Sequence, residues 1–274
     1  MVLVSTTIGF LLGFQSPLNL TLLTWTLFGT YLISAGGAAL NHYIERDLDP
    51  LMARTCNRPL ASGRLKPHEA LIFGCLLALL GLGILAHQVN FLTSLLAVIT
   101  AGTYIFVYTP LKRVTWLNTL VGAIPGALPP VGGFTAASGH LGLEAWFLFA
   151  ILFIWQHPHF YAIALLYKDD YASAGFKMLP CVDDKNASKT ARHIIFFSCL
   201  LVPISILPAT TGMFTSTTYL AGAISLSVMM LIGGIEFRRT RSRLAARSLL
   251  ISSLVFIPGL FICILADLAI SSWH

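Results

Sequence analysis

The most prominent feature of the sequence is a succession of long apolar segments separated by polar stretches. These segments lie at about 1–14, 22–42, 69–87, 91–110, 116–137, 143–165, 193–211, 217–236 and 246–270. Most reach the roughly 17–25 residues that a helix needs to cross the hydrocarbon core of a bilayer. The pattern predicts an all-α integral membrane protein with nine transmembrane helices, of which the first is the shortest.

Composition supports a membrane protein and excludes an ordinary soluble domain. The chain is 56% hydrophobic and only 10% charged, whereas soluble domains carry about 25% charged residues. Its five cysteines form no paired CxxC spacing, so neither a disulfide framework nor a Cys/His metal site is indicated. We expect residues 1–274 to form a single transmembrane domain.

The basic residues predict how the chain is oriented in the membrane. All 17 Lys and Arg residues lie in four connections, within 46–66, 112–113, 168–192 and 238–247. By the positive-inside rule these connections are cytoplasmic, which places the N-terminus inside. This distribution explains the net charge of +6 without a nucleic-acid partner. No signal or transit peptide is visible, which favours the bacterial inner (cytoplasmic) membrane.

The second apolar segment ends in an unusual cluster of acids. Asn41, Glu45 and Asp49 are spaced to lie on one helical face, and Pro50 predicts that the helix closes at Asp49. Carboxylates are unfavourable at a helix C-terminus, and Glu45 and Asp49 repel each other. A cation among them would relieve both problems, and these ligands suit Mg²⁺. A charged loop with internal ion pairs is the alternative.

A weak internal repeat links this cluster to the sixth segment, which ends at Lys168, Asp169, Asp170 and Tyr171. It predicts two four-helix pseudo-repeats plus one helix, arranged around a central cavity open to the cytoplasmic side.

Glycine and proline positions add detail to the predicted helices. Pro125, Pro129 and Pro130 predict that segment 116–137 is kinked. It then either lines the cavity or is kinked for packing alone. Gly36 and Gly37, followed by two alanines, predict close contact between helices.

The predicted site suits a substrate that is apolar at one end and anionic at the other. An isoprenyl diphosphate fits this description, with Mg²⁺ and basic side chains holding the diphosphate. An allylic cation would need a dry site and aromatic faces. Aromatic candidates, each with packing as the alternative role, are Tyr104, Phe106, Tyr108, Trp116, Trp155, Phe160 and Tyr161.

Several sequence blocks carry a resemblance to a known family. Asn41-x-x-x-Glu45-x-x-x-Asp49 resembles the first acidic motif, N-x-x-x-D-x-x-x-D, of the UbiA-type intramembrane prenyltransferases. A second motif, D-x-x-x-D, is absent, because Ser173 and Ala174 stand where its second Asp would be. The haem-farnesylating branch of the family lacks this Asp too. Similarity to that branch extends over 41–49, 52–55, 57–60, 108–113, 155–160, 167–171, 174–175 and 178–180, whereas Lys177 stands where the family often has Pro.

The resemblance implies a Mg²⁺-dependent reaction. A farnesyl group would pass from farnesyl diphosphate to a vinyl group of haem B, which makes haem O for terminal oxidases. The implied metal-binding and catalytic residues are Asn41, Glu45, Asp49 and Asp169, with Asp47 and Asp170 as supporting or alternate ligands. The implied substrate-binding residues are Arg54, Arg58, Lys112, Arg113, Lys168, Asp170, Tyr171 and His159. A haem-handling protein or haem A synthase is the implied partner.

Three questions stay open at this point. His159 or His157 is a candidate axial ligand to haem iron, although packing is the commoner role of a helical histidine. A related enzyme acting on another acceptor, such as 4-hydroxybenzoate, a quinone precursor or a chlorophyll-type ring, is the second hypothesis. A multispan transporter is the third, but the acids cluster at helix ends rather than at mid-membrane.

Overall fold

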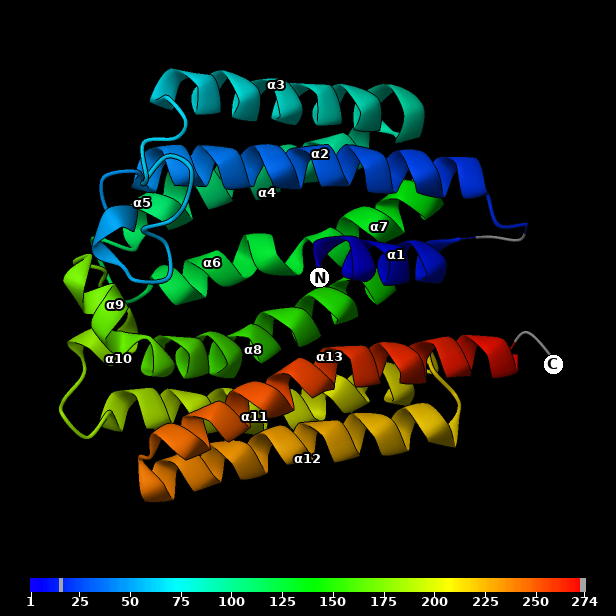
Figure 1. Ribbon diagram of the computed structural model, residues 1–274. Helices are drawn as coiled ribbons and strands as arrows, with labels where there is room; N and C mark the ends of the chain where they lie inside the picture. Colours follow the sequence, from blue (N-terminus) through cyan, green and yellow to red (C-terminus); the bar gives the residue numbers. More distant parts are fainter. Residues whose placement is uncertain (15–16, 272–274) are drawn as a thin grey trace. The chain divides into compact units, whose positions relative to one another are not determined.

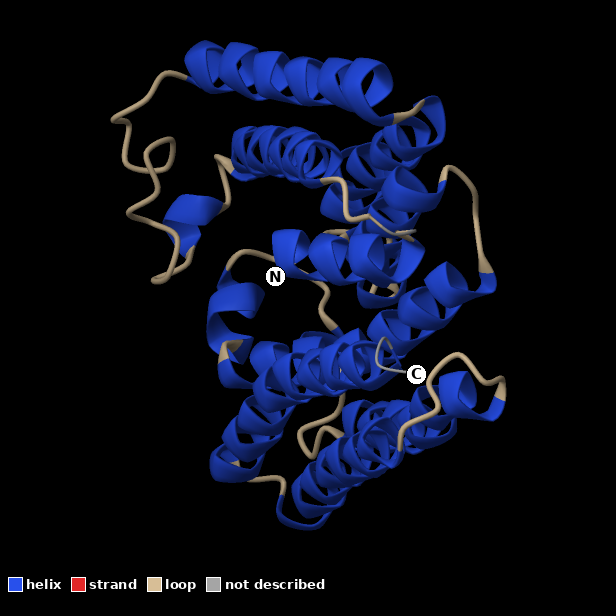
Figure 2. Ribbon diagram, turned by 90° about the vertical axis from the view of Figure 1, so that its right-hand side faces the viewer, coloured by secondary structure: helices blue, strands red, loops and turns tan. Residues whose placement is uncertain are grey.

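The computed structural model describes residues 1–14 and 17–271, and within them it contains helices and loops but no strand (Figures 1 and 2). The predicted all-α class is confirmed. The helices are α1 (Val2–Gly13), α2 (Leu20–Glu45), η1 (Asp49–Leu51), α3 (Pro67–Ile84), η2 (Leu85–Val89), α4 (Phe91–Gly102), η3 (Thr103–Tyr108), α5 (Thr109–Leu111), α6 (Asn118–Ala127), α7 (Pro129–Ser138), α8 (Leu143–Leu166), α9 (Lys168–Ser173), α10 (Leu179–Val182), α11 (Ser188–Thr210), α12 (Thr217–Thr240) and α13 (Arg243–Ser271).

Eight helical stretches within the described residues are long and apolar enough to cross a membrane. They run over Leu20–Glu45, Pro67–Val89, Phe91–Leu111, Asn118–Ser138, Leu143–Leu166, Ser188–Thr210, Thr217–Thr240 and Arg243–Ile270. Helix α1 has 12 residues, fewer than the roughly 17 that a crossing requires. A ninth crossing, the orientation of the chain and the central cavity stay predictions.

The chain divides into two compact units. Unit 1 comprises Met1–Phe149 and Asp169–Met178, and unit 2 comprises Ala150–Lys168 and Leu179–His274. In unit 1, α2 packs along α3 and α1 packs against α7 (Figure 1). In unit 2, α12 packs against both α11 and α13.

Close packing of α2 on α3 depends on glycine, as predicted for Gly36. A Cβ atom at Gly36 would lie 2.6 Å from the carbonyl oxygen of Gly74. The two backbones can approach this closely only because neither residue has a side chain. Gly37 takes no part in this contact, because the nearest atom to its Cβ position is a ring carbon of Tyr104 at 3.9 Å.

Proline shapes two further helices of unit 1. The predicted kink in segment 116–137 is confirmed, since the chain breaks at Leu128 into α6 and α7, and Pro129 begins α7. Pro110 has no N–H, and in a regular α-helix its ring would collide with the carbonyl group one turn earlier. The widened π-helical turn η3 ends at Tyr108, two residues before Pro110.

The end of α2 differs from the sequence prediction. The helix ends at Glu45, and Asp49 begins the separate 3₁₀ turn η1. Asn41 and Glu45 therefore share one helix face, but Asp49 is not part of that face. Helical backbone is unfavourable for the residue before a proline, and a carboxylate is unfavourable at a helix C-terminus. The helix therefore stops one turn earlier than predicted.

Helix α11 in unit 2 is capped by an acid that precedes it. Asp183 accepts hydrogen bonds from the backbone N–H of Thr190 at 2.7 Å, its hydroxyl at 2.8 Å and the N–H of Lys189 at 3.2 Å. Partial burial raises the pKa of the Asp183 carboxyl, but these hydrogen bonds outweigh it and hold the pKa below the usual 3.8.

Candidate active site

A polar pocket of about 150 Å³ lies within unit 1, at the end of α2. Its walls come from α2, the loop after η1, the η3–α5 turn and the segment 169–178. The pocket is lined by Asn41, Glu45, Met52, Arg54, Thr55, Arg58, Tyr104, Tyr108, Lys112, Tyr171, Phe176 and Met178.

Asn41 is held by the irregular backbone around Pro110. Its side-chain Nδ2 donates to the hydroxyl of Thr109 at 3.1 Å, and that hydroxyl donates to the carbonyl oxygen of Tyr104 at 2.8 Å. Asn41 and Thr109 are both buried. Since this chain of bonds uses the amide nitrogen, it leaves the amide oxygen of Asn41 as an acceptor at the pocket.

Glu45 forms a buried ion pair across the pocket wall. The Nζ of Lys112 lies 2.7 Å from Oε1 of Glu45, and the two side chains are 12% and 6% exposed. The same ammonium lies 4.8 Å from the ring centre of Tyr108 and 5.7 Å from that of Phe176. Aromatic faces and a carboxylate thus compensate the desolvated charge of Lys112.

Asp49 is fully buried and is neutralised by Arg58. Nη1 of Arg58 lies 2.8 Å and 3.0 Å from the two carboxylate oxygens. The backbone carbonyl of Asp49 also accepts a hydrogen bond from the Thr55 hydroxyl at 2.8 Å. Asp49 does not line the pocket itself, but it holds Arg58, which does.

The segment 169–178 contributes one wall of the pocket and is held by hydrogen bonds to backbone carbonyl oxygens. The N–H of Lys177 donates to the carbonyl of Lys112 at 2.7 Å, and the Asn118 side chain donates to the carbonyl of Lys177 at 3.0 Å. Ser173 donates to the carbonyl of Leu51 at 2.8 Å. The turn at Gly175 has φ +70°, a conformation that suits glycine.

The charges that line this pocket favour an anion. Arg54, Arg58 and Lys112 face it, against one lining carboxylate, Glu45. Arg54 lies over the ring of Tyr171, 4.2 Å from its centre. A small site with three cations on its walls attracts groups such as phosphate.

The structure brings together six of the predicted site residues and places the others elsewhere. Those in the pocket wall are Asn41, Glu45, Arg54, Arg58, Lys112 and Tyr171. Asp47 is 80% exposed beside Arg46. Arg113 and Asp169 are exposed and Asp170 is half-buried, and none of these three lines the pocket. Lys168 belongs to unit 2.

Some of the aromatic candidates line the pocket and others do not. Tyr104 and Tyr108 stack with ring centres 5.7 Å apart and line the pocket. Phe106 is 76% exposed, and Trp155 lies in unit 2, where its Nε1 donates to the carbonyl of Ser253. Phe176 was not predicted from the sequence; it lies between the matching stretches 174–175 and 178–180.

Two histidines of α8 make hydrogen bonds through Nδ1. The Nδ1 of His157 lies 2.8 Å from the carbonyl oxygen of Phe153. The Nδ1 of His159 lies 2.7 Å from the hydroxyl oxygen of Ser253. His157 is fully buried against Phe197, whereas His159 is half-buried.

The residues of the pocket fit a Mg²⁺ ion that arrives with a phosphate ligand. No group of three His, Cys, Asp or Glu side chains converges within residues 1–14 and 17–271. A dedicated metal cage is not required, because Mg²⁺ is usually held by one or two carboxylates, substrate phosphates and waters. The amide oxygen of Asn41 and the carboxylate of Glu45 provide such a partial set at the pocket.

Comparison with known proteins assigns the chain to a family. The chain belongs to the UbiA prenyltransferase family, whose model matches residues 2–257.

Three solved structures share the fold at low identity. A digeranylgeranylglyceryl phosphate synthase matches with a TM-score of 0.81 at 17% identity, covering 97% of this chain and 92% of that one. A UbiA homologue from Aeropyrum pernix K1 has a TM-score of 0.72 at 20% identity, covering 99% and 96%. A UbiA homologue from Archaeoglobus fulgidus, bound to DMAPP and Mg²⁺, has a TM-score of 0.67 at 18% identity, covering 96% and 94%.

Curated relatives narrow the comparison within the family. The chain is 45% identical to the protoheme IX farnesyltransferase of Solibacter usitatus, over 97% of this chain and 94% of that protein. It is also 45% identical to the protoheme IX farnesyltransferase of Salinibacter ruber, over 94% of this chain and 91% of the relative. The similarity therefore spans nearly the whole of each protein.

Proposed function

We propose that this protein transfers the farnesyl group of farnesyl diphosphate to a vinyl group of haem B. The observation that carries the donor half is the pocket in which Asn41 and Glu45 face Arg54, Arg58 and Lys112. The full-length similarity to two protoheme IX farnesyltransferases supports haem B as the acceptor. The apolar helices suit both the isoprenoid tail and the tetrapyrrole.

The ion pairs of the pocket indicate how the diphosphate would bind. Lys112 is paired with Glu45, and Arg58 is paired with Asp49. A diphosphate with its Mg²⁺ brings both an anion for the two cations and a cation for the carboxylates. The two cations can then pair with the diphosphate while the two carboxylates pair with Mg²⁺, so every buried charge stays compensated. An anion without a metal would leave the carboxylates unpaired.

The metal would be held by Asn41 and Glu45, with Asp49 and Asp169 as the further ligands expected from the sequence. When bound, Mg²⁺ withdraws negative charge from the leaving diphosphate. Arg54, Arg58 and Lys112 stabilise the same charge by direct hydrogen bonds. Asp47 and Asp170 would act on these groups only indirectly.

The proposed reaction breaks the bond between farnesyl C1 and the diphosphate oxygen. The electron pair leaves with the diphosphate, and the vinyl group of haem B supplies the pair that forms the new carbon–carbon bond. Water adds to the resulting cation and releases a proton, which completes a hydroxyethylfarnesyl side chain. The rings of Tyr104, Tyr108 and Tyr171 stand at the pocket and can stabilise the allylic cation.

The charge distribution supports a location for this activity. The Lys- and Arg-rich connections include all the basic residues of the pocket. We place the site on the cytoplasmic side of a bacterial inner membrane, because connections rich in Lys and Arg face the cytoplasm. The product is apolar and membrane-bound, so a haem-handling protein or haem A synthase is the expected recipient.

An acceptor panel tests the proposal. Membranes that contain the protein are incubated with farnesyl diphosphate, Mg²⁺ and one of haem B, 4-hydroxybenzoate or chlorophyllide, and products are resolved by mass. We expect only haem B to gain the mass of farnesyl plus water, and EDTA to prevent it. Farnesylation of another acceptor with haem B unchanged would keep the prenyltransferase and replace the acceptor. If folded protein formed no product and released no diphosphate, the result would favour a transporter.

A further inference from the structure

Segment 169–178 carries two aromatic rings that lie against cations of the polar pocket. The ring centre of Tyr171 lies 4.2 Å from the guanidinium carbon of Arg54. The ring centre of Phe176 lies 5.7 Å from Nζ of Lys112. The two rings are themselves 6.1 Å apart, and the N–H of Phe176 donates to the carbonyl of Tyr171 at 2.9 Å. The placement of this segment therefore determines where two of the pocket's cations are held.

Asn118 joins the segment to the loop between α5 and α6. It is the first residue of α6 and is fully buried. Its Nδ2 donates to the carbonyl of Thr115 at 2.6 Å and to the carbonyl of Lys177 at 3.0 Å. A carbonyl oxygen can only accept, so these two bonds use both N–H groups of the amide. Its Oδ1 accepts from the hydroxyl of Thr119 at 3.3 Å.

The bond from Asn118 to Lys177 acts close to the aromatic wall and to Lys112. Lys177 directly follows Phe176, and its own N–H donates to the carbonyl of Lys112 at 2.7 Å. Removal of the Asn118 amide would leave the Lys177 carbonyl without this donor. The segment could then shift relative to Lys112, and the ring of Phe176 would shift with it.

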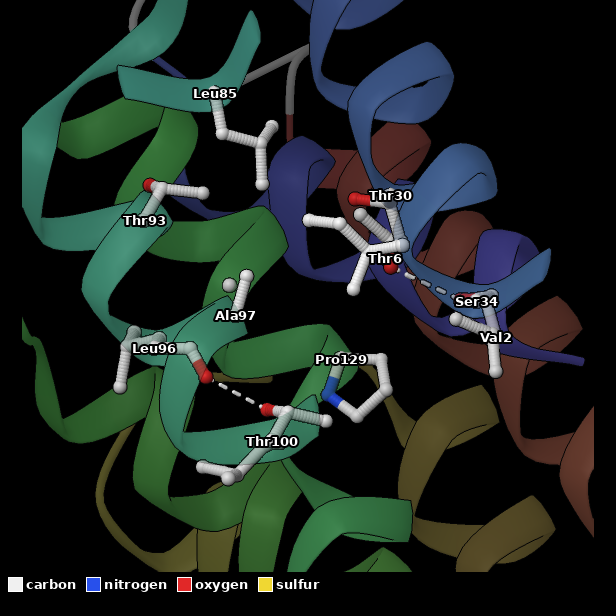
Figure 3. Close-up of a pocket in the computed structure, with 13 residues that line it drawn as sticks. Val2, Thr6, Thr30, Ser34, Leu85, Thr93, Leu96, Ala97, Thr100 and Pro129 are labelled. Carbon is white, nitrogen blue, oxygen red and sulfur yellow. Dashed lines mark hydrogen bonds between the residues drawn. The ribbon is translucent and has the colours of Figure 1, made fainter. Parts of the chain in front are cut away.

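Asn118 is placed to affect the polar pocket but not the apolar pocket of unit 1. The apolar pocket, of about 50 Å³, lies among α1, α2, η2, α4 and α7 (Figure 3). None of the described residues that line it belongs to 112–118 or 169–178. Asn118 does not line the polar pocket either, so its effect there must pass through the residues that it holds.

We propose that Asn118 is a positioning residue for the polar pocket. Its two N–H donors hold segment 169–178 so that the two rings keep Lys112 and Arg54 directed at an anion. This inference rests on the proposed function, because it takes the anion to be the diphosphate of the prenyl donor. A loosened segment would leave every group of the pocket present but would remove the preorganisation on which affinity depends.

Donor binding by Asn118 variants tests this proposal. The protein is placed in lipid nanodiscs with Mg²⁺, and its affinity for farnesyl S-thiolodiphosphate is measured by titration calorimetry. Asn118→Asp removes both N–H donors with almost no change in size. Asn118→Ser keeps one donor and takes over the test should Asn118→Asp fail to fold. The control is Tyr219→Phe, which removes a buried hydrogen bond of 2.9 Å to the carbonyl of Ser205 in unit 2.

A double-mutant cycle separates positioning from a general loss of stability. Phe176→Leu removes the ring that faces Lys112, so in this background the bond from Asn118 has less to position. We expect Asn118→Asp to weaken binding roughly tenfold in the unmodified background, as for a polar group left unpaired. The loss should be no more than about threefold in the Phe176→Leu background, because residues that act through one another are not additive.

We expect a smaller loss, of about threefold, for Asn118→Ser, and a change within about twofold for Tyr219→Phe. Unchanged affinity in the folded Asn118 variants would overturn the proposal and leave the proposed function intact. An equal loss in Tyr219→Phe, or the full tenfold loss in the Phe176→Leu background, would do the same. Failure of the unmodified protein to bind the analogue would overturn the proposed function as well.

Discussion

At the scale of single residues, the polar pocket is held together by pairs whose partners are far apart in sequence. Glu45 and Lys112 are 67 positions apart, and Asn41 and Thr109 are 68 apart. The spacing of Asn41 and Glu45 predicted that they share a helix face. The identity of their partners could not be predicted, because it depends on how α2 packs against the η3–α5 turn.

Lys112 is predicted to bind the diphosphate directly. Lys112→Met should weaken binding of farnesyl S-thiolodiphosphate by about 10- to 100-fold, the loss expected for a hydrogen bond to a charged group. Titration calorimetry in nanodiscs measures it. Arg113→Met is the matched control, because Arg113 is the next residue but is exposed and outside the pocket. Similar losses in the two variants would argue that only general positive charge matters.

Thr109 is predicted to orient Asn41. Thr109→Val removes the hydroxyl that accepts from Asn41 at 3.1 Å and leaves a buried amide unpaired, a cost of about 1–3 kcal/mol. We expect a lower melting temperature and a higher Mg²⁺ concentration for half-maximal turnover. Thr109→Ser retains the hydroxyl and should restore both. If the serine variant behaved like the valine variant, the hydrogen bond would not be the cause.

His159 is predicted to contact haem iron through Nε2, because its Nδ1 is hydrogen-bonded to Ser253. His159→Ala should shift the absorption spectrum of added haem B and weaken its binding, while binding of the farnesyl analogue is unchanged. His157→Ala is the matched comparison, since His157 is fully buried and should affect folding more than haem. Unchanged haem affinity and spectrum in folded His159→Ala protein would exclude this role.

At the scale of helices, apolar pattern and proline positions predicted most of what the structure contains. The break between α6 and α7 follows from Pro129, and the close approach of α2 and α3 follows from Gly36. The end of α2 was placed one turn too late. Helical spacing extends through Asp49, but the acids and Pro50 end the helix at Glu45. Spacing alone cannot distinguish a helix from a turn that continues it.

The N-terminus of α11 should respond to pH through Asp183. Its pKa is lowered in the folded state, so its stabilisation is present above about pH 4 and is lost as the pH falls below 3.8 through the folded pKa. The hydrogen-exchange rates of the Lys189 and Thr190 backbone amides, corrected for intrinsic rates, should rise as the pH falls through this range.

Asp183→Asn should remove that pH dependence. Exchange near neutral pH should be about fivefold faster, since a helix cap contributes roughly 1 kcal/mol. Asp47→Asn, at an exposed acid, is the control and should exchange like the unmodified protein. If the pH dependence of hydrogen exchange were the same in Asp183→Asn and in the unmodified protein, Asp183 would not be the pH-sensitive cap of α11.

At the scale of the whole molecule, composition and hydropathy were sufficient to predict an all-helical membrane protein. Sequence blocks in loops and at helix positions such as 155–160 were sufficient to predict its family, which the match over residues 2–257 confirms. The pocket needed the structure, because it combines α2 with segment 169–178, whose wall residues include Phe176 and Met178. Neither residue is charged; Phe176 lies outside the matching stretches, and Met178 lies in one of them but has no side-chain chemistry that marks it as a pocket residue.

The measurement that tests the central claim most directly is farnesylation of haem B by purified protein, with Asp49→Asn beside the unmodified chain. Asp49 holds Arg58 at the pocket and is the third residue of the acidic motif. We predict a haem heavier by farnesyl plus water in the unmodified protein and in Asp47→Asn. We predict none in folded Asp49→Asn or with EDTA. Near-normal product from Asp49→Asn would contradict the account.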